Sequence, residues 1–284
     1  MHDTTAIFVH IPKTAGTTLA RIIARQYPPR ARMLLERHDE GVREFQALPE
    51  ARRAEIRLLR GHIPYGLHAD CPRPATYFTL LREPIDRLVS YYYFVQREPQ
   101  HYLYDYANTP GMTLKRYVED RVSLQMANMQ TRLISGVWTD PGYGECDQGT
   151  LKMAKRNLER QFAVVGLTER FDETLLLLKR ALGWRNVFYV RHNVTRGRPR
   201  RASLDAETLA VLRASNRLDL ELYEHAKALL AQQVCAQGPA FARALWAFQL
   251  ANRLAQPAAR AYWQARGFSL RAWLQGKRAT QTTS

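Results

Sequence analysis

Short apolar runs alternate with longer amphipathic segments along most of the chain. The pattern predicts four strands, at residues 7–9, 76–81, 162–166 and 187–190. Helical spacing of apolar residues predicts helices over residues 17–26, 34–57, 84–97, 171–182 and 200–233. Thr168 is expected as an N-cap. Because strands that alternate with helices are typical of a parallel sheet, the pattern predicts an α/β fold.

The first predicted strand leads into a turn with the features of an anion site. Residues 11–18 have the sequence IPKTAGTT. The first turn of a helix has unpaired N–H groups and the positive end of the helix dipole, so it can hold a phosphate together with Lys13, Thr17 and Thr18. Gly16 is expected to let the backbone approach the ligand. In a Walker A loop the lysine directly follows the last glycine, whereas Lys13 precedes Gly16, which argues against ATP or GTP hydrolysis.

A second strand-to-helix segment narrows the ligand. Residues 80–93 have the sequence LLREPIDRLVSYYY, with Arg82 at the strand exit, Pro84 in the first helical turn and Ser90 further along the helix. An arginine and a hydroxyl can bind another phosphate, and loops after two strands of one sheet meet over one edge. Two such sites suit a nucleoside with phosphates at both ends. The candidate ligand is 3′-phosphoadenosine 5′-phosphosulfate.

These motifs resemble those of carbohydrate sulfotransferases related to heparan sulfate 2-O-sulfotransferase. Residues 11–18 resemble the family's 5′-phosphosulfate loop, and residues 82–90 resemble its 3′-phosphate motif. Further blocks that look like the family lie at residues 60–66, 165–169 and 193–199, so the resemblance runs from about residue 5 to residue 230. It implies a P-loop-like parallel sheet flanked by helices, and transfer of a sulfuryl group to a hydroxyl, most simply on a sugar.

The resemblance also implies roles for individual residues. His62 matches a catalytic histidine and is the expected general base, while Arg60 stands where the family has another histidine. Lys13 is expected both to bind the donor and to neutralise charge on its bridging oxygen. The donor-binding residues implied are Lys13, Thr14, Ala15, Gly16, Thr17, Thr18, Arg82, Ser90, Thr195, Arg196 and Arg198. The product is adenosine 3′,5′-bisphosphate, and no metal is expected.

Other residues near these motifs are expected to have ordinary structural roles. His10 is expected to be a strand histidine satisfied by its neighbours, with approach to the loop site as the alternative. The tyrosines at 91–93 are expected to pack their helix. Arg82 and Arg87 could each form a surface ion pair with Glu83 or Asp86, but the neighbouring anion loop argues against this alternative. Residues 98–111 are expected to form a lid or an acceptor wall. A weaker signal for acceptor contacts comes from Arg132 with Asn128 and Gln130.

Composition changes this picture little. The formal net charge is +16, and 35 of the 42 basic residues are arginine, which favours an anionic partner but also follows from an arginine-rich genome. Cys71, Cys146 and Cys235 have neither disulfide nor zinc-site spacing, and the chain has no long apolar run. We therefore expect a soluble protein in the cytoplasm.

The chain divides into an expected catalytic domain, residues 1–235, and a helical extension, residues 236–284. The extension is basic and carries Trp246, Trp263 and Trp273. Its expected role is packing on the domain, with contact to a membrane surface or an oligomer partner as the alternative.

Two other functions stay open at the level of sequence. A kinase with an atypical phosphate loop would need a magnesium-binding acid at a strand end, for which Glu83 is the candidate. A nucleic-acid-binding module would use the positive charge, but the arginines are scattered and no known nucleic-acid-binding motif is visible, so no nucleic-acid partner is expected.

Overall fold

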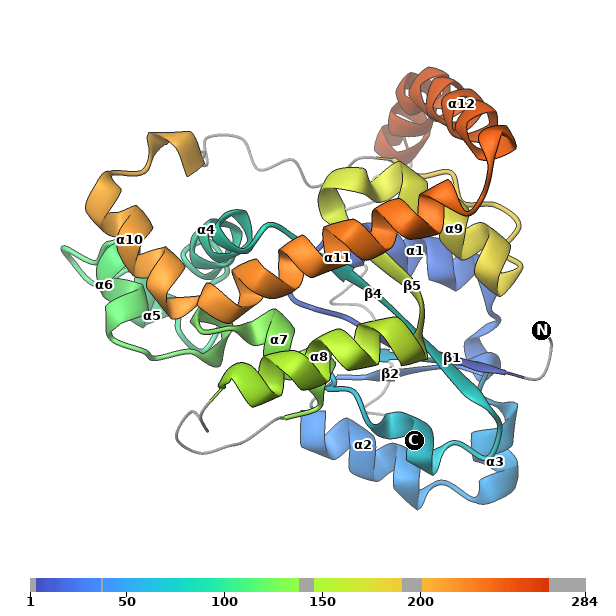
Figure 1. The fold of residues 1–284 in the computed structure, drawn as a ribbon, viewed down its shortest axis with the longest axis horizontal. Coiled ribbons are helices and arrows are strands. Elements are labelled where there is room, and N and C mark those ends of the chain that lie inside the picture. The colour runs from blue at the N-terminus through green and yellow to red at the C-terminus, as the bar shows by residue number, and fades with distance from the viewer. Residues whose placement is uncertain (1–3, 37, 138–145, 191–200, 266–284) are drawn as a thin grey trace.

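Within the residues that the computed structural model describes (4–36, 38–137, 146–190 and 201–265), five strands form one sheet (Figure 1). The strands are β1 (Thr5–Val9), β2 (Arg32–Leu35), β3 (Leu58–Gly61), β4 (Ala75–Leu81) and β5 (Phe162–Leu167). Their order is β2-β3-β1-β4-β5, and every neighbouring pair is parallel. The predicted α/β fold with a parallel sheet is confirmed. The central strand β1 is buried along its whole length, as is typical of a parallel sheet covered on both faces.

Helices connect and cover the strands. They are α1 (Gly16–Gln26), α2 (His38–Ala47), α3 (Glu50–Glu55), α4 (Pro84–Val95), α5 (Tyr104–Ala107), α6 (Leu114–Glu119), α7 (Met129–Ser135), α8 (Gln148–Gln161), α9 (Phe171–Leu182), α10 (Ala206–Ser215), α11 (Arg217–Cys235) and α12 (Pro239–Ala265). Short 3₁₀ turns are η1 (Pro29–Ala31), η2 (Leu67–Asp70), η3 (Leu124–Met126), η4 (Thr168–Arg170) and η5 (Arg201–Ser203). Helices α8, α9 and α11 pack against β5, and α2 packs against β2.

The segment predicted as one helix over residues 34–57 is divided in the structure. It contains the end of β2, then α2 and α3, with Pro49 as the N-cap residue of α3. Strands β2 and β3 were not predicted. Each has only four residues, which is too short to show a clear two-residue apolar period. In the edge strand β2, the apolar Leu34 is also 41% exposed.

The strand predicted at residues 187–190 is not a strand. Side chains of α12 satisfy the backbone groups of Tyr189. The Tyr189 N–H donates to Asn252 Oδ1 (3.1 Å), and Gln256 Nε2 donates to the Tyr189 carbonyl (2.6 Å). Tyr189 is thus buried under a helix instead of at the sheet edge, whereas Phe188 is 42% exposed, and a local pattern cannot distinguish this arrangement from a strand.

The end of β5 also differs from the prediction. Thr168 does not cap a helix with its side chain. It begins the turn η4, and its hydroxyl donates to the carbonyl of Leu81 (3.1 Å) at the end of β4. The hydroxyl therefore joins the ends of two neighbouring strands.

The long helix predicted over residues 200–233 breaks at Asn216 into α10 and α11. The Asn216 Oδ1 accepts from the Asn128 N–H (3.1 Å). Asn128 Oδ1 accepts from the Asp219 N–H (3.1 Å), and the Asp219 carboxylate accepts from the Thr131 N–H (2.7 Å). The N-termini of α7 and α11 thus cap each other, and these bonds replace those of a continuous helix.

A second apolar core lies beside the core of the sheet, between α4, α5, α6 and α10. Tyr91 and Tyr92 are buried in it, as predicted for helix packing. The stretch 98–111, expected as a lid, contributes α5 to this core. Ala107 is fully buried, and its carbonyl accepts from Gln96 Nε2 (3.2 Å). This part of the stretch is therefore fixed in the fold.

Helix α12 packs against α9 and lies at the margin of the molecule (Figure 1). Across the described parts of the chain, no helix has the combination of length and apolarity that crossing a bilayer requires.

Candidate active site

Three neighbouring strands bring the predicted site residues to one edge of the sheet. Val9 at the end of β1 pairs with Gly61 on β3 and with Thr79 on β4. The loop at residues 10–15 follows β1, His62 follows β3, and Arg82 follows β4. Because the strands are parallel and adjacent, these three segments lie side by side, at the edge where ligands bind in open α/β sheets.

The backbone of the β1–α1 loop has a shape that suits an anion. Lys13 and Ala15 have positive φ angles of 71° and 62°, and such turns direct successive N–H groups into one concavity. The Thr14 hydroxyl donates to the Ile11 carbonyl (2.8 Å) inside the turn, so Thr14 would contact a ligand through its backbone. Helix α1 follows with no acidic residue in its first turn and no side-chain cap. An anionic group would supply both the missing cap and the missing negative charge.

Gly16 is needed for a reason that differs from the prediction. A Cβ built on Gly16 would lie 1.6 Å from His10 Nε2, with two further ring carbons at 2.3 and 2.4 Å. The imidazole of His10 therefore occupies the space that a side chain at position 16 would take. The glycine makes room for a protein ring in this structure, whereas the sequence predicted that it makes room for the ligand.

Arg82 joins the second loop to the first. One of its guanidinium nitrogens donates to the Lys13 carbonyl (3.1 Å). The buried side chain of Gln130 holds the Arg82 backbone, accepting from its N–H and donating to its carbonyl, both at 3.0 Å. The Lys13 ammonium lies 4.1 Å from the centre of the Phe94 ring on α4. Arg82 therefore reaches the anion loop from a fixed backbone position, while the ammonium of Lys13 packs over an aromatic ring of α4.

His62 is oriented by a carbonyl of the neighbouring strand. Its Nδ1 lies 2.7 Å from the His10 carbonyl oxygen. A carbonyl only accepts, so Nδ1 carries the hydrogen and Nε2 of the neutral ring has the free lone pair. Part of His62 is open to solvent. Burial nevertheless lowers the pKa of His62, and the positive charge of the Arg60 guanidinium lowers it further. The hydrogen bond to the His10 carbonyl acts in the opposite direction and raises this pKa, but its effect is smaller than that of burial. A neutral imidazole with a free Nε2 can act as a general base.

The two histidines form a pair in which protonation is disfavoured. Their ring centres are 4.4 Å apart, and the His10 ring also stacks on Phe8 at 5.2 Å. Burial holds the pKa of His10 well below its ordinary value, and the charges of His62, Arg60 and Lys13 act in the same direction. His10 is therefore a neutral wall of the site near pH 7.

Glu83, the acid that a kinase would need, is already engaged. Its carboxylate accepts from the Asp86 N–H (2.7 Å), capping α4, and pairs with Arg201 (3.1 Å). Its own N–H donates to Glu169 Oε1 (3.0 Å). In the described segments, no group of three or more His, Cys, Asp or Glu residues is arranged to hold a metal ion.

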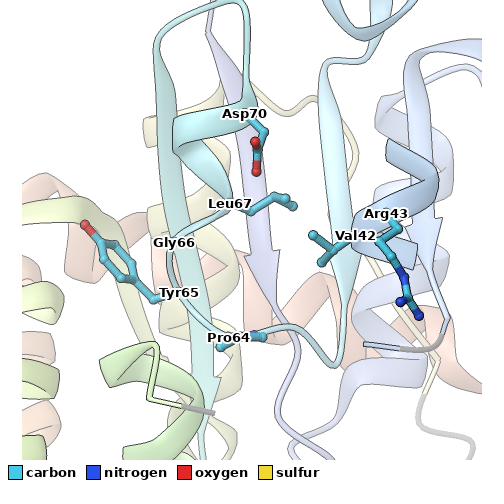
Figure 2. Close-up of a pocket in the computed structure, with 7 residues that line it drawn as sticks. All are labelled: Val42, Arg43, Pro64, Tyr65, Gly66, Leu67 and Asp70. Carbon is cyan, nitrogen blue, oxygen red and sulfur yellow. The ribbon is translucent and has the colours of Figure 1, made fainter. Parts of the chain in front are cut away.

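A cavity of about 380 Å³ lies beside the loop that follows His62 (Figure 2). Its lining residues are Val42, Arg43, Pro64, Tyr65, Gly66, Leu67 and Asp70. Figure 2 shows Val42 and Leu67 facing each other, with the Tyr65 ring turned away from them. The walls are therefore largely apolar, with one guanidinium and one carboxylate at the margins.

A comparison with known protein families identifies the family of this chain. A family model described as galactose-3-O-sulfotransferase matches residues 3–256. The chain belongs to the galactose-3-O-sulfotransferase family. The predicted resemblance to carbohydrate sulfotransferases is thus confirmed, and the matching model is the galactose 3-O type, whereas the sequence motifs suggested a relation to the heparan sulfate 2-O type.

Named relatives of this galactose-3-O-sulfotransferase family member have about a quarter of their residues identical to it. Bovine (Bos taurus) galactose-3-O-sulfotransferase 3 is 27% identical over 268 residues, which are 83% of this chain and 59% of the relative. Human (Homo sapiens) galactose-3-O-sulfotransferase 2 is 26% identical, over 83% of this chain and 63% of the relative. Human heparan-sulfate 6-O-sulfotransferase 1 is also 26% identical, over 81% and 66%. The chain spans about three fifths of the first two relatives.

Among solved structures, mouse sulfotransferase SULT7A1 complexed with PAP is similar at a TM-score of 0.39 and 15% identity. The match covers 76% of this chain and 65% of that chain.

The remaining predicted residues of this galactose-3-O-sulfotransferase family member vary in accessibility. Thr17 is exposed and Thr18 is half-buried on the first turn of α1, while Ser90 is only 8% exposed on α4. Arg87 is no surface ion pair: it is fully buried, and its guanidinium donates to the Gln125 carbonyl. Thr195, Arg196 and Arg198 lie outside the described residues.

Two residues that shape this family member's site were assigned other roles from sequence. His10 directly precedes the loop motif, so its proximity to the loop was visible, but its contact with Gly16 and His62 was not. Gln130 was grouped with acceptor contacts, whereas its side chain fixes Arg82, which is 48 positions earlier. A contact over such a separation has no local sequence signal.

Proposed function

We propose that this protein transfers the sulfuryl group of 3′-phosphoadenosine 5′-phosphosulfate to a hydroxyl of a carbohydrate. The observation that carries the proposal is the convergence of an anion-binding loop, Arg82 and a base-competent His62 on three adjacent strand ends. Membership of a family of carbohydrate sulfotransferases supports it. The bound donor supplies the electrophilic sulfur.

The residues of the chain would divide the chemical work among three segments. The N–H groups of the β1–α1 loop and of the first turn of α1 would hold the 5′-phosphate, and Lys13 would offset negative charge beside it. Arg82 would bind the second phosphate, together with Ser90. His62 Nε2 would accept the proton of the acceptor hydroxyl, because Nδ1 is fixed on the His10 carbonyl.

We place the acceptor in the cavity beside the loop after His62. Sugar rings present both C–H faces and hydroxyls, and this cavity offers the apolar Val42 and Leu67 together with the polar Arg43 and Asp70. If the cavity binds the acceptor, Arg43→Ala should raise the acceptor KM and leave the affinity for adenosine 3′,5′-bisphosphate unchanged. An unchanged acceptor KM would show that the acceptor binds elsewhere.

The first test of the function is binding of adenosine 3′,5′-bisphosphate without added metal, with magnesium-ATP as the comparison. Selective binding that weakens in Arg82→Met supports the donor site. Preference for magnesium-ATP would favour the kinase alternative, which the engagement of Glu83 argues against.

The second test separates the base from the binding site. His62→Asn keeps an N–H group near the His10 carbonyl but has no basic nitrogen. We expect turnover to fall by about 10²-fold or more, while adenosine 3′,5′-bisphosphate affinity stays near that of the wild type. Full turnover in this variant would contradict the assignment of the base.

Two further features remain proposals. We propose that the C-terminal extension contacts another surface, because apolar side chains of α12 are exposed. We also propose a cytoplasmic location, which the three free cysteines support and fractionation of cells would test.

A further inference from the structure

Helix α12 carries an apolar stripe that is exposed in the part of the chain that the structure describes. Trp246 is 67% exposed, Leu250 40% and Leu254 71%. Residues four positions apart lie on one face of a helix, so these three side chains form a continuous row, which we call the outer stripe. The opposite side of the helix holds the buried Phe241 and Phe248.

The inner side fixes the orientation of the helix. The Phe248 ring packs against Phe188 with 5.3 Å between ring centres. Asn252, only 6% exposed, and Gln256 bond to the N–H and carbonyl of Tyr189. The exposure of the outer stripe is therefore a property of a docked helix, which stands at the margin of the molecule (Figure 1).

Two arginines flank the outer stripe. Arg243 and Arg253 are exposed, and their positions three residues before Trp246 and three after Leu250 place them on the same face. Residues 225–284 contain eight lysines and arginines and no aspartate or glutamate. This segment therefore supplies half of the net charge of +16 with about a fifth of the chain.

We propose that the outer stripe docks the protein on the surface of an anionic lipid bilayer. Trp246, Leu250 and Leu254 would enter the headgroup region, while Arg243 and Arg253 would keep their guanidinium groups at the lipid phosphates. A second copy of the chain is a poorer occupant, because pairing two such faces would bring arginines together without any acid from this segment. The inference is independent of the proposed reaction.

Vesicle co-sedimentation of the full chain tests the proposal. We expect binding to vesicles of phosphatidylserine and phosphatidylcholine, little binding to phosphatidylcholine alone, and loss of binding at high salt. The triple variant Trp246→Ser, Leu250→Ser, Leu254→Ser and the double variant Arg243→Gln, Arg253→Gln should each weaken binding at least tenfold. Tyr102→Ser, at an exposed aromatic on another part of the surface, is the matched control and should bind like the wild type.

Quenching by brominated lipids gives a second readout. Replacing Trp246 by Phe should remove most of the quenching, because this tryptophan is the one in the outer stripe. Equal binding of the triple variant and the wild type would overturn the proposal. Loss of a concentration-dependent dimer in the triple variant, without any vesicle binding by the wild type, would assign the stripe to a second copy instead. Urea unfolding midpoints near that of the wild type would show that the variants are folded.

Discussion

Replacing Gly16 by alanine tests why a glycine is required in the anion loop. The new methyl group would lie 1.6 Å from His10 Nε2, whereas real Cβ contacts essentially never fall below 3.0 Å. No positive φ is involved at Gly16, so the conflict is with the ring and not with the backbone conformation. The His10 imidazole must therefore move, and it packs against Phe8 and His62.

The expected cost follows from the crowding. Inserting a methyl group into a filled site costs about 1–3 kcal/mol, and the better helix propensity of alanine returns at most about 1 kcal/mol. We expect Gly16→Ala to lower the free energy of unfolding by about 1–2 kcal/mol. Displacement of the ring into the anion loop should also weaken adenosine 3′,5′-bisphosphate binding.

A double-mutant cycle identifies the cause. Urea unfolding would be measured for Gly16→Ala, His10→Ala and the double variant. Once the ring at position 10 is removed, the alanine at position 16 should cost little, so the two changes should couple by about 1–2 kcal/mol. Binding of adenosine 3′,5′-bisphosphate should not fall further when Gly16→Ala is added to His10→Ala.

The control is Gly149→Ala, because Gly149 also lies in the first turn of a helix and its nearest neighbour to a new Cβ is a side-chain oxygen at 3.2 Å. We expect its stability to stay near that of the wild type. Additive effects of the two site changes would refute the reasoning. If stability were unaffected but ligand binding were lost even without the His10 ring, the glycine would serve the approach of the ligand, as the sequence suggested.

Three more predictions follow from contacts around the site. Gln130→Leu should lower the free energy of unfolding by about 1–3 kcal/mol and weaken adenosine 3′,5′-bisphosphate binding, because the Arg82 N–H and carbonyl lose their partners. A wild-type free energy by urea unfolding together with a wild-type affinity by calorimetry would contradict this. Arg60→Gln should raise the pKa of His62 and move the acid limb of the kcat/KM profile to higher pH. An acid limb that does not move would contradict either the assignment of His62 as the base or the effect of the Arg60 charge on its pKa. The folded protein holds the pKa of His10 well below the unfolded value, so it binds fewer protons than the unfolded chain and should lose stability as the pH falls below about 6.5; His10→Gln should flatten the dependence of the urea midpoint on pH between 7 and 5.

The sequence was informative wherever function depends on a continuous segment. The strand, loop and helix around residues 5–26 and 75–95 were recognisable because backbone N–H groups, a lysine and hydroxyls must occur close together to hold a phosphate. Very short strands were not recognisable, and neither was a segment whose backbone groups bond to the side chains of a distant helix. Strands β2 and β3 have four residues each, and the backbone of Tyr189 bonds to side chains of α12.

By itself the sequence determined the alternation of the longer strands and helices, the anion loop, and the arginine that follows β4, while His62 was identified through a family motif and not through the strand β3 that precedes it. Only the tertiary structure decided that His62 receives its tautomer from the His10 carbonyl, that Gly16 yields space to an imidazole, and that Gln130 fixes Arg82. The first group of properties arises from neighbours in the chain, through backbone geometry and side-chain period. The second group arises from contacts between segments about 50 residues apart or from the packing of a ring across a turn. The order of strands places His62 beside His10, and the packing of α7 at the end of β4 places Gln130 beside Arg82.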